Sequence, residues 1–183
     1  RSVWFNYNAS RTELERQTNI RAMAEVLTAT RRLDDFITKV GILPRATASR
    51  QQALGREPDG ALVPYLRTLL GQMPKDEVYG VYIAFEHKRW TDENAMPWVD
   101  RRSWPNTTRL NYDYHDPKQD WYHGAKTSRA FYITDPYYDD GGSEITMVSL
   151  TMPVFDGATN FVGVAGAEDR KSTRLNSSHI PLS

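Results

Sequence analysis

The N-terminal part of the chain carries apolar residues near helical spacing. Thr12 and, three residues later, Glu15 form a capping box, which predicts the start of a helix. The apolar stripe then comprises Leu14, Ile20, Met23, Leu27, Leu33, Ile37 and Val40. This pattern predicts a long amphipathic helix of about seven or eight turns. We expect Ile42-Leu43-Pro44 to end it, because proline disfavours a helical residue before it.

Two further segments complete the predicted helical part of the chain. Residues 46–54 predict a short helical segment before the turn-rich stretch 55–60. A second amphipathic helix closed by Pro74 is marked by Leu62, Leu66, Leu69, Leu70 and Met73.

The remainder of the chain shows strand patterns. Runs of β-branched and aromatic residues predict strands at Val78–Phe85, Ala130–Thr134, Ile145–Phe155 and Phe161–Ala167, and a short helix is expected at Asp120–Lys126. Asp156-Gly157 predicts a hairpin between the last two strands. The fold class is therefore α+β, an antiparallel sheet with a long N-terminal helix and helices mainly on one face.

A long polar connection, Glu86–Leu110, separates the first strand from the rest. It contains Trp90, Trp98 and Trp104, and such a long unstructured loop is unusual in a compact domain. The tryptophans indicate that it packs over something, either as a lid over a pocket or as a plain cover for the sheet.

Composition excludes several classes of function. The 183 residues suit one domain, and 23 basic against 23 acidic residues give no charge bias towards nucleic acid. The absence of cysteine excludes disulfides, thiolate metal sites and a cysteine nucleophile. No apolar run reaches the roughly 20 residues of a membrane helix. His87, His115 and His123 show no metal-ligand spacing, so we expect neither a metal nor a cofactor.

The C-terminal segment has an unusual composition. Residues 169–179 read DRKSTRLNSSH, the one-frame translation of a common sequencing-library adapter. We therefore expect residues 1–168 to be the natural domain, a piece of a longer protein, and 169–183 to be non-native; the alternative is a genuine polar tail. The adapter would also supply the last base of codon 168, so the native residue is either Glu168 as written or an aspartate.

An ordered set of motifs resembles a known family. The set consists of Asp116-Pro117-Lys118-Gln119-Asp120-Trp121-Tyr122, Asp135-Pro136-Tyr137-Tyr138-Asp139, Val148–Val154 and Gly163–Glu168. It resembles the membrane-distal module of double Cache (dCache) sensor domains, and the resemblance covers nearly all of residues 1–168. It implies a PAS-like pocket in an extracytoplasmic, periplasmic input module of a bacterial chemoreceptor, histidine kinase, nucleotide cyclase or phosphatase. Segments absent from this chain would anchor such a protein in the membrane.

The same resemblance implies a ligand site. The family motif of amino-acid-binding members is matched by Tyr114, Trp121, Tyr122, Asp139 and Glu168. Its arginine position is occupied by Gln119, next to Lys118, so the bidentate contact to a ligand carboxylate is missing. We therefore expect a small polar ligand, cationic or neutral, such as an amine. The aromatic residues, including Tyr138, would stack against it while the acids accept its N–H groups.

Three alternatives remain open from the residues themselves. The segment Asp139-Asp140-Gly141-Gly142 is also typical of a simple turn whose aspartates cap local N–H groups. The chain could be a non-binding structural module that forms a homodimer through the helical stripe between Thr12 and Val40. A hydrolase using Asp139 and Glu168 as acid and base is the third, but the sequence lacks a nucleophile–base set, so we expect no enzyme.

Overall fold

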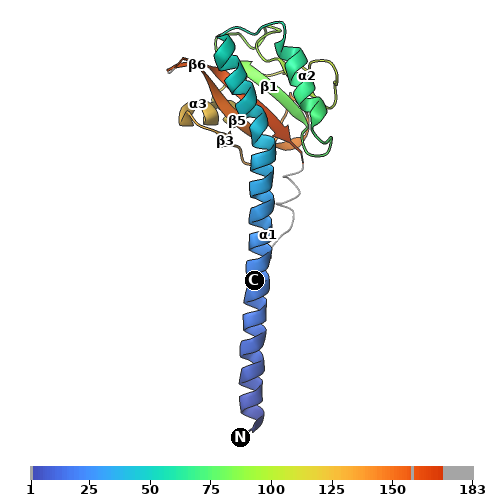
Figure 1. Cartoon of the computed structure of the whole chain (residues 1–183), viewed down its shortest axis with the longest axis vertical. Helices are drawn as coiled ribbons and strands as arrows, with labels where there is room; N and C mark the ends of the chain where they lie inside the picture. Colours follow the sequence, from blue (N-terminus) through green and yellow to red (C-terminus); the bar gives the residue numbers. More distant parts are fainter. Residues whose placement is uncertain (1, 158, 171–183) are drawn as a thin grey trace. The chain divides into compact units, whose positions relative to one another are not determined.

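Three helices and six strands make up the described part of the chain, residues 2–157 and 159–170 of a computed structural model. In chain order they are α1 (Ser2–Leu54), α2 (Leu62–Gln72), β1 (Gly80–Phe85), β2 (Trp98–Asp100), α3 (Asp120–Ser128), β3 (Tyr132–Ile133), β4 (Tyr137–Tyr138), β5 (Thr146–Asp156) and β6 (Asn160–Asp169) (Figure 1). The predicted α+β class is confirmed. The expected non-native segment lies outside the described residues, apart from Asp169 and Arg170.

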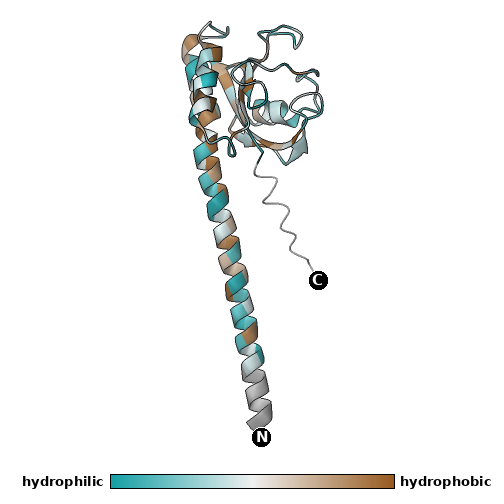
Figure 2. Cartoon of the chain, turned by 90° about the vertical axis from the view of Figure 1, so that its right-hand side faces the viewer, coloured by the Kyte–Doolittle hydropathy of each residue, from teal (hydrophilic) through white to brown (hydrophobic). Residues whose placement is uncertain are grey.

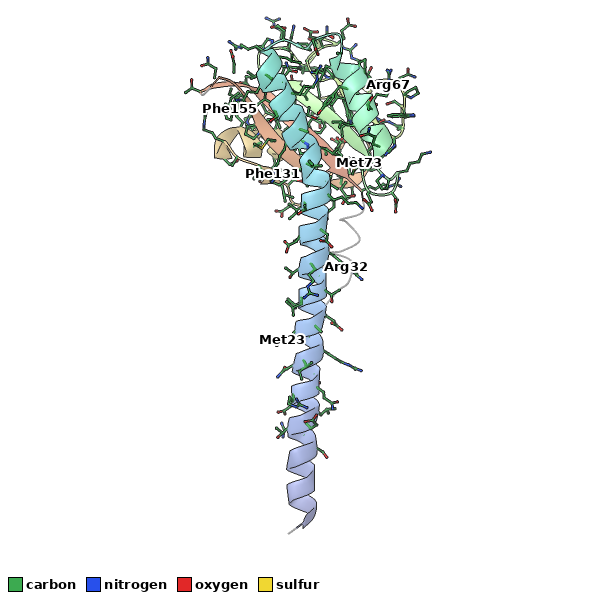
Figure 3. All side chains as sticks on the ribbon, in the orientation of Figure 1. Met23, Arg32, Arg67, Met73, Phe131 and Phe155 are labelled. Atoms are coloured by element: carbon green, nitrogen blue, oxygen red, sulfur yellow. The ribbon has the colours of Figure 1, made fainter. Side chains whose placement is uncertain are left out.

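The chain divides into two units, residues 1–38 and residues 39–183, and α1 contributes to both. In the first unit, apolar and polar positions alternate along the helix (Figure 2). Most of its apolar side chains are exposed, Met23 among them (Figure 3). The helix begins at Ser2, so the predicted start at Thr12 is wrong. Glu15 instead pairs with Arg11 one turn away, at 3.1 Å.

The prediction that the helix ends at Pro44 is also wrong. The helix runs through Pro44 to Leu54, and the predicted segment 46–54 is its continuation. A proline inside a helix removes one hydrogen bond, but burial of Val40, Leu43 and Ala48 on one face offsets that cost. The end is fixed at Gly55, which has φ of +101° and whose N–H donates to Gln51 O.

All strands of the sheet pair antiparallel, in the order β2-β1-β6-β5-β3, and β4 pairs with β5. The predicted hairpin between β5 and β6 is confirmed, and Gly157 supplies the positive φ of its turn. Two strands escaped prediction. β2 lies inside the long polar connection and β4 within the Tyr137-Tyr138 pair, and both are too short to show an alternating pattern.

The long connection Glu86–Leu110 forms neither a single lid nor a single cover. Trp98 lies in β2 and is completely buried, whereas Trp90 and Trp104 are 39% and 40% exposed. The ring of Trp104 lies against Gly71 of α2. Only the central tryptophan therefore contributes to the sheet.

Helices cover both faces of the sheet. α2 packs on β1 and β2 and buries Leu62, Leu66 and Leu70, and Figure 1 shows it over the sheet together with the part of α1 from Lys39 onward. α3 packs on β5, β6 and β3. Within the described residues, no helix has the length and hydrophobicity required to cross a bilayer.

Candidate functional site

Two rows of residues cross the sheet on the face that α3 covers. Directly paired residues of antiparallel strands point to the same face, so the register defines each row. The first row is Asp100, Gly80, Glu168 and Ser149, and the second is Trp98, Tyr82, Gly166, Thr151 and Tyr132. α3 packs on this face because Tyr82, Ala84 and Val164 share a cluster with Trp121, Tyr122 and Ala125.

The first row places polar side chains in the interior. Asp100, Glu168 and Ser149 are all buried, and buried carboxylates require compensating partners. Asp100 has them. Its Oδ1 accepts hydrogen bonds from the N–H groups of Arg102 and Ser103 and from the Ser103 hydroxyl, and Arg102 Nη2 donates to its Oδ2 at 3.2 Å. Asp100 is therefore a satisfied structural acid.

Glu168 is less well compensated. Its Oε2 accepts one described hydrogen bond, from the neutral indole N–H of Trp98, at 3.2 Å. Burial raises the pKa of Glu168 well above its ordinary value, and the charges of Asp139 and Asp100 add to this, against the opposing effects of Trp98 and Arg102. Gly80 makes the room for this carboxylate, because a Cβ there would lie 2.3 Å from Glu168 Oε2.

An aromatic cluster covers the second row. Tyr114 is buried, and its hydroxyl donates to the carbonyl oxygens of Phe85 and Ala95 at 2.7 and 3.1 Å. Trp121 meets the Tyr82 ring edge-on, with 5.1 Å between ring centroids. The hydroxyl of Tyr122 bonds Glu86, to which Lys126 also donates at 2.6 Å. The cluster is thus fixed at its outer side by hydrogen bonds and leaves its rings towards the sheet.

The local sequence explains how α3 presents these rings. Asp120 lies in the first turn and Lys126 in the last, which suits the helix dipole, and Arg129 ends the helix in a left-handed conformation. Trp121, Tyr122 and Ala125 are three to four residues apart or adjacent, so they form the buried stripe of this short helix.

A chain of hydrogen bonds connects the aromatic cluster to Asp139. The indole N–H of Trp121 donates to the Tyr112 hydroxyl at 3.2 Å, and that hydroxyl donates to Asp139 Oδ1 at 2.7 Å. Asp139 Oδ2 also accepts the Ser143 N–H at 2.6 Å, so the aspartate both caps its turn and faces the cluster. Sequence reasoning missed Tyr112. No local pattern marked it, because its role depends on Asp139, which lies 27 positions later in the chain.

The structure brings five of the predicted residues together, namely Tyr114, Trp121, Tyr122, Asp139 and Glu168. The other three are not buried. Tyr138 is 57% exposed and donates to Glu144 at 3.1 Å, and Lys118 is exposed. Gln119 is half-buried and precedes α3.

Within the Tyr137-Tyr138 pair, it is Tyr137 that points towards the sheet. Tyr137 is largely covered, and its hydroxyl is 2.8 Å from Ser149 Oγ in the polar row. Neighbouring residues of a strand point to opposite faces, so only one member of the pair can reach the site. The choice of Tyr138 is therefore corrected to Tyr137 as the residue that lies against the sheet.

The chemistry of this face is acidic and aromatic. Asp139 is buried close enough to Glu168 for its charge to raise the pKa of Glu168, and the ring of Trp121 lies over the same face. Carboxylates accept N–H groups and aromatic faces attract cations, so the arrangement suits a protonated amine. Among the described residues, no group of three or more His, Cys, Asp or Glu side chains could hold a metal ion.

More than half of the chain matches a known protein family. A family model described as methyl-accepting chemotaxis protein-like, first PDC sensor domain, matches residues 65–173. No curated protein matches the chain.

Solved structures with the same fold are more distant in sequence. The ligand-binding domain of the Pseudomonas aeruginosa PAO1 amino-acid chemoreceptor PctC in complex with GABA has a TM-score of 0.59 at 19% identity, covering 81% of this chain and 61% of that domain. The sensory domain of the Campylobacter jejuni chemoreceptor Tlp3 (CcmL) with isoleucine bound has a TM-score of 0.68 at 16% identity, covering 90% and 64%. The ligand-binding domain of Mlp24 with asparagine has a TM-score of 0.62 at 21% identity, covering 90% and 63%. The chain thus spans less than two thirds of the length of these domains.

Proposed function

Because the chain belongs to the family of methyl-accepting chemotaxis protein-like first PDC sensor domains, we propose that it binds a small ligand with a protonated amine between the sheet and α3. The observation that carries this proposal is Glu168. It is a carboxyl group in the middle of a sheet, buried to 3% exposure, with a neutral indole as its described hydrogen-bond donor. Such a group is costly unless a cation joins it.

Further features of the site support a cation rather than an anion. Asp139 adds a second buried acid, and Trp121 and Tyr112 add aromatic rings whose orientation is fixed by hydrogen bonds, an aromatic wall of the site. The ligands named for the three similar domains, GABA, isoleucine and asparagine, all contain a primary ammonium group. In this chain Gln119 stands where amino-acid-binding members are expected to carry an arginine, so the ammonium group is the part of such ligands that the site would retain.

In the cell, this module would act as the extracytoplasmic input of a bacterial transmembrane signalling protein. Binding would favour one of two conformations of the receptor and so bias its output, the usual logic of a population shift. Because the module only binds its ligand, we expect no turnover of any amine. An incubation followed by mass spectrometry would detect a product if the hydrolase alternative were correct.

A thermal-shift screen of the whole domain tests the ligand class. Amines, amino acids, carboxylates and purines would each be added at millimolar concentration. A ligand at about 100 times its Kd stabilises the folded state by about 2.7 kcal/mol. For a domain of this size, that corresponds to a melting temperature higher by roughly 5–10 °C. We expect this shift with amines and not with simple carboxylates; a response to carboxylates alone would contradict the proposal.

Two adjacent aspartates provide a matched control. Asp139 is buried and bonded to Tyr112, whereas Asp140 is exposed. Asp139→Asn should therefore lower the affinity for the amine found in the screen, and Asp140→Asn should leave it unchanged. Glu168→Asp keeps the charge and should keep binding, which also covers the alternative identity of residue 168. Equal effects of the two asparagine substitutions would argue for a non-specific charge effect.

The alternative role as a dimerisation module is favoured by one specific feature, the exposed apolar stripe on α1. Ile20, Met23 and Leu27 are spaced three and four residues apart on one side of the helix, and they are 52%, 65% and 54% exposed. We propose that a second copy of this helix covers the stripe in the full receptor. Since the chain contains no cysteine, Met23→Cys would crosslink only to its counterpart in a dimer. The yield with and without the amine tests dimerisation and its response to ligand, and a monomer at high concentration would refute the contact.

A further inference from the structure

One buried hydroxyl on the proposed binding face has no partner. Tyr82 is 1% exposed, and its hydroxyl makes no hydrogen bond within the described part of the chain. Its neighbours differ in this respect. Tyr112 and Tyr114 bond Asp139 and two carbonyl groups, and Tyr137 bonds Ser149. Because an unpaired buried hydroxyl is costly, it points to a partner that the folded chain itself does not supply.

The register places this hydroxyl beside Glu168. Tyr82 of β1 is paired with Gly166 of β6, and Glu168 lies two residues further along β6 on the same face. The Tyr82 ring lies directly over Gly166, where an added Cβ would be 2.3 Å from the hydroxyl oxygen. Burial raises the pKa of Tyr82 and the charges of Tyr137 and Glu168 add to that effect, whereas the nearby Ser149 hydroxyl opposes it. The hydroxyl is therefore held above the centre of the sheet, close to the undercompensated carboxyl group.

The other groups around it are already engaged. Trp121 meets the ring edge-on and uses its N–H for Tyr112, and Ser149 Oγ bonds the Tyr137 hydroxyl while lying near enough to the Tyr82 hydroxyl to oppose the rise in its pKa. The Tyr82 hydroxyl is therefore a hydrogen-bond acceptor near Glu168, whose described hydrogen-bond donor is the neutral Trp98 indole and whose pKa is lowered only in part by Arg102. A primary ammonium group has three N–H donors and needs several acceptors, whereas a trimethylammonium group has none to donate.

We propose that the Tyr82 hydroxyl is a specificity-determining contact, accepting one N–H of a primary ammonium group whose charge is held by Glu168. This inference rests on the proposed amine-binding function and deepens it. It predicts that the site discriminates primary amines from their N-trimethyl counterparts. The discrimination arises from a directed hydrogen bond, whereas the carboxylate and the aromatic wall would attract both cations.

Calorimetric titration of the whole domain with matched pairs tests the assignment. The pairs are ethanolamine with choline, and GABA with its N-trimethyl derivative. The wild type should prefer the primary member of a pair. A hydrogen bond to a charged group corresponds to about 10- to 100-fold in affinity, so Tyr82→Phe should weaken the primary amine by that factor and leave the N-trimethyl compound unchanged. An equal loss for both members, or no loss for the primary amine, overturns the role of Tyr82 while amine binding stands. No binding of any amine to the wild type overturns the proposed function itself.

A stability measurement without ligand separates a recognition role from a folding role. Tyr82→Phe removes an unpaired hydroxyl, so the melting temperature of the ligand-free domain should stay the same or rise. Tyr114→Phe is the matched control, because it removes a hydroxyl bonded to Phe85 and Ala95 on the same face, and it should lower the melting temperature. A decrease for Tyr82→Phe as large as that for Tyr114→Phe would show that its hydroxyl supports the fold, and would overturn the proposal.

Discussion

The substitution Glu168→Gln should make the ligand-free domain more stable while it removes amine binding. The carboxyl group is buried in the sheet, and its described partner, the Trp98 indole, can donate equally well to an amide oxygen. Glutamine keeps the shape of the side chain and removes the charge. The substitution therefore eliminates a buried ionisable group whose described hydrogen-bond donor is neutral and whose charge Arg102 offsets only in part.

The expected magnitude follows from the burial of this one group. Leaving a buried polar group undercompensated costs about 1–3 kcal/mol. In a domain of this size, each kcal/mol changes the melting temperature by roughly 2–4 °C, so the increase at neutral pH should be on the order of 2–12 °C. An increase in stability with loss of function is the usual result when a residue that serves binding is replaced by one that suits the fold.

The pH dependence gives the sign of the effect. Burial raises the pKa of Glu168 in the folded state above its ordinary value of 4.5, so the folded state holds this proton more tightly than the unfolded state. Below pH 4.5 both states are protonated and the pKa difference contributes no pH dependence. As the pH rises from 4.5 towards the folded-state pKa, the wild type loses stability that the Gln variant keeps.

Thermal melts followed by circular dichroism between pH 4 and pH 8 measure this difference. The melting temperature of Glu168→Gln relative to wild type should increase with pH over that range. The exposed acid Asp140 provides the control, since Asp140→Asn should show no comparable trend. A variant that is less stable than wild type at pH 8, or a difference that does not change with pH, would refute the reasoning.

Three further substitutions or titrations probe the same face. Gly80→Ala should destabilise the domain by about 1–3 kcal/mol and weaken amine binding, because the new Cβ would lie 2.3 Å from Glu168 Oε2. Gly60→Ala is the control in the melting and binding assays, because a Cβ at Gly60 would have nothing within 4 Å. Gly142→Ala should have a similar effect through Asp139, whose Oδ2 would be 2.1 Å from the new Cβ, and unchanged amine affinity would speak against the role of Asp139. Burial raises the pKa of Tyr82 and of Tyr137, so ultraviolet difference spectra should show their ionisation only on unfolding, and stability should fall as the pH rises above 10; titration of all tyrosines near pH 10 in the folded protein would contradict this.

The sequence alone was sufficient for those parts of the fold that have a long periodic pattern. β5 and β6 show long runs of strand-forming residues around Asp156-Gly157, and α2 shows a clear apolar stripe. All three elements were therefore predicted close to their observed bounds. The course of α1 through Pro44 was not predictable from local preference, because burial of Val40 and Leu43 against the rest of the domain overrides it.

The site shows the same division between pattern and tertiary contact. Tyr114, Trp121 and Tyr122 could be selected from the motif that they form, since the motif fixes their spacing on and before α3. Tyr112 and Tyr82 could not, because their importance depends on Asp139 and Glu168, which come next to them only in the folded chain. The choice between Tyr137 and Tyr138 depended on the register of a two-residue strand, which no pattern of that length determines.

The number of protons exchanged during binding shows whether Glu168 receives a protonated amine. Burial raises the pKa of Glu168 in the ligand-free domain, and an ammonium ion beside it would favour the ionised form. Titration calorimetry of the best amine from the screen, repeated in two buffers with different ionisation enthalpies and at several pH values, measures the protons exchanged. We expect the release of up to one proton per ligand, and Glu168→Gln should lose this release together with tight binding. Binding without proton release at every pH, and with the same affinity in Glu168→Gln, would contradict it.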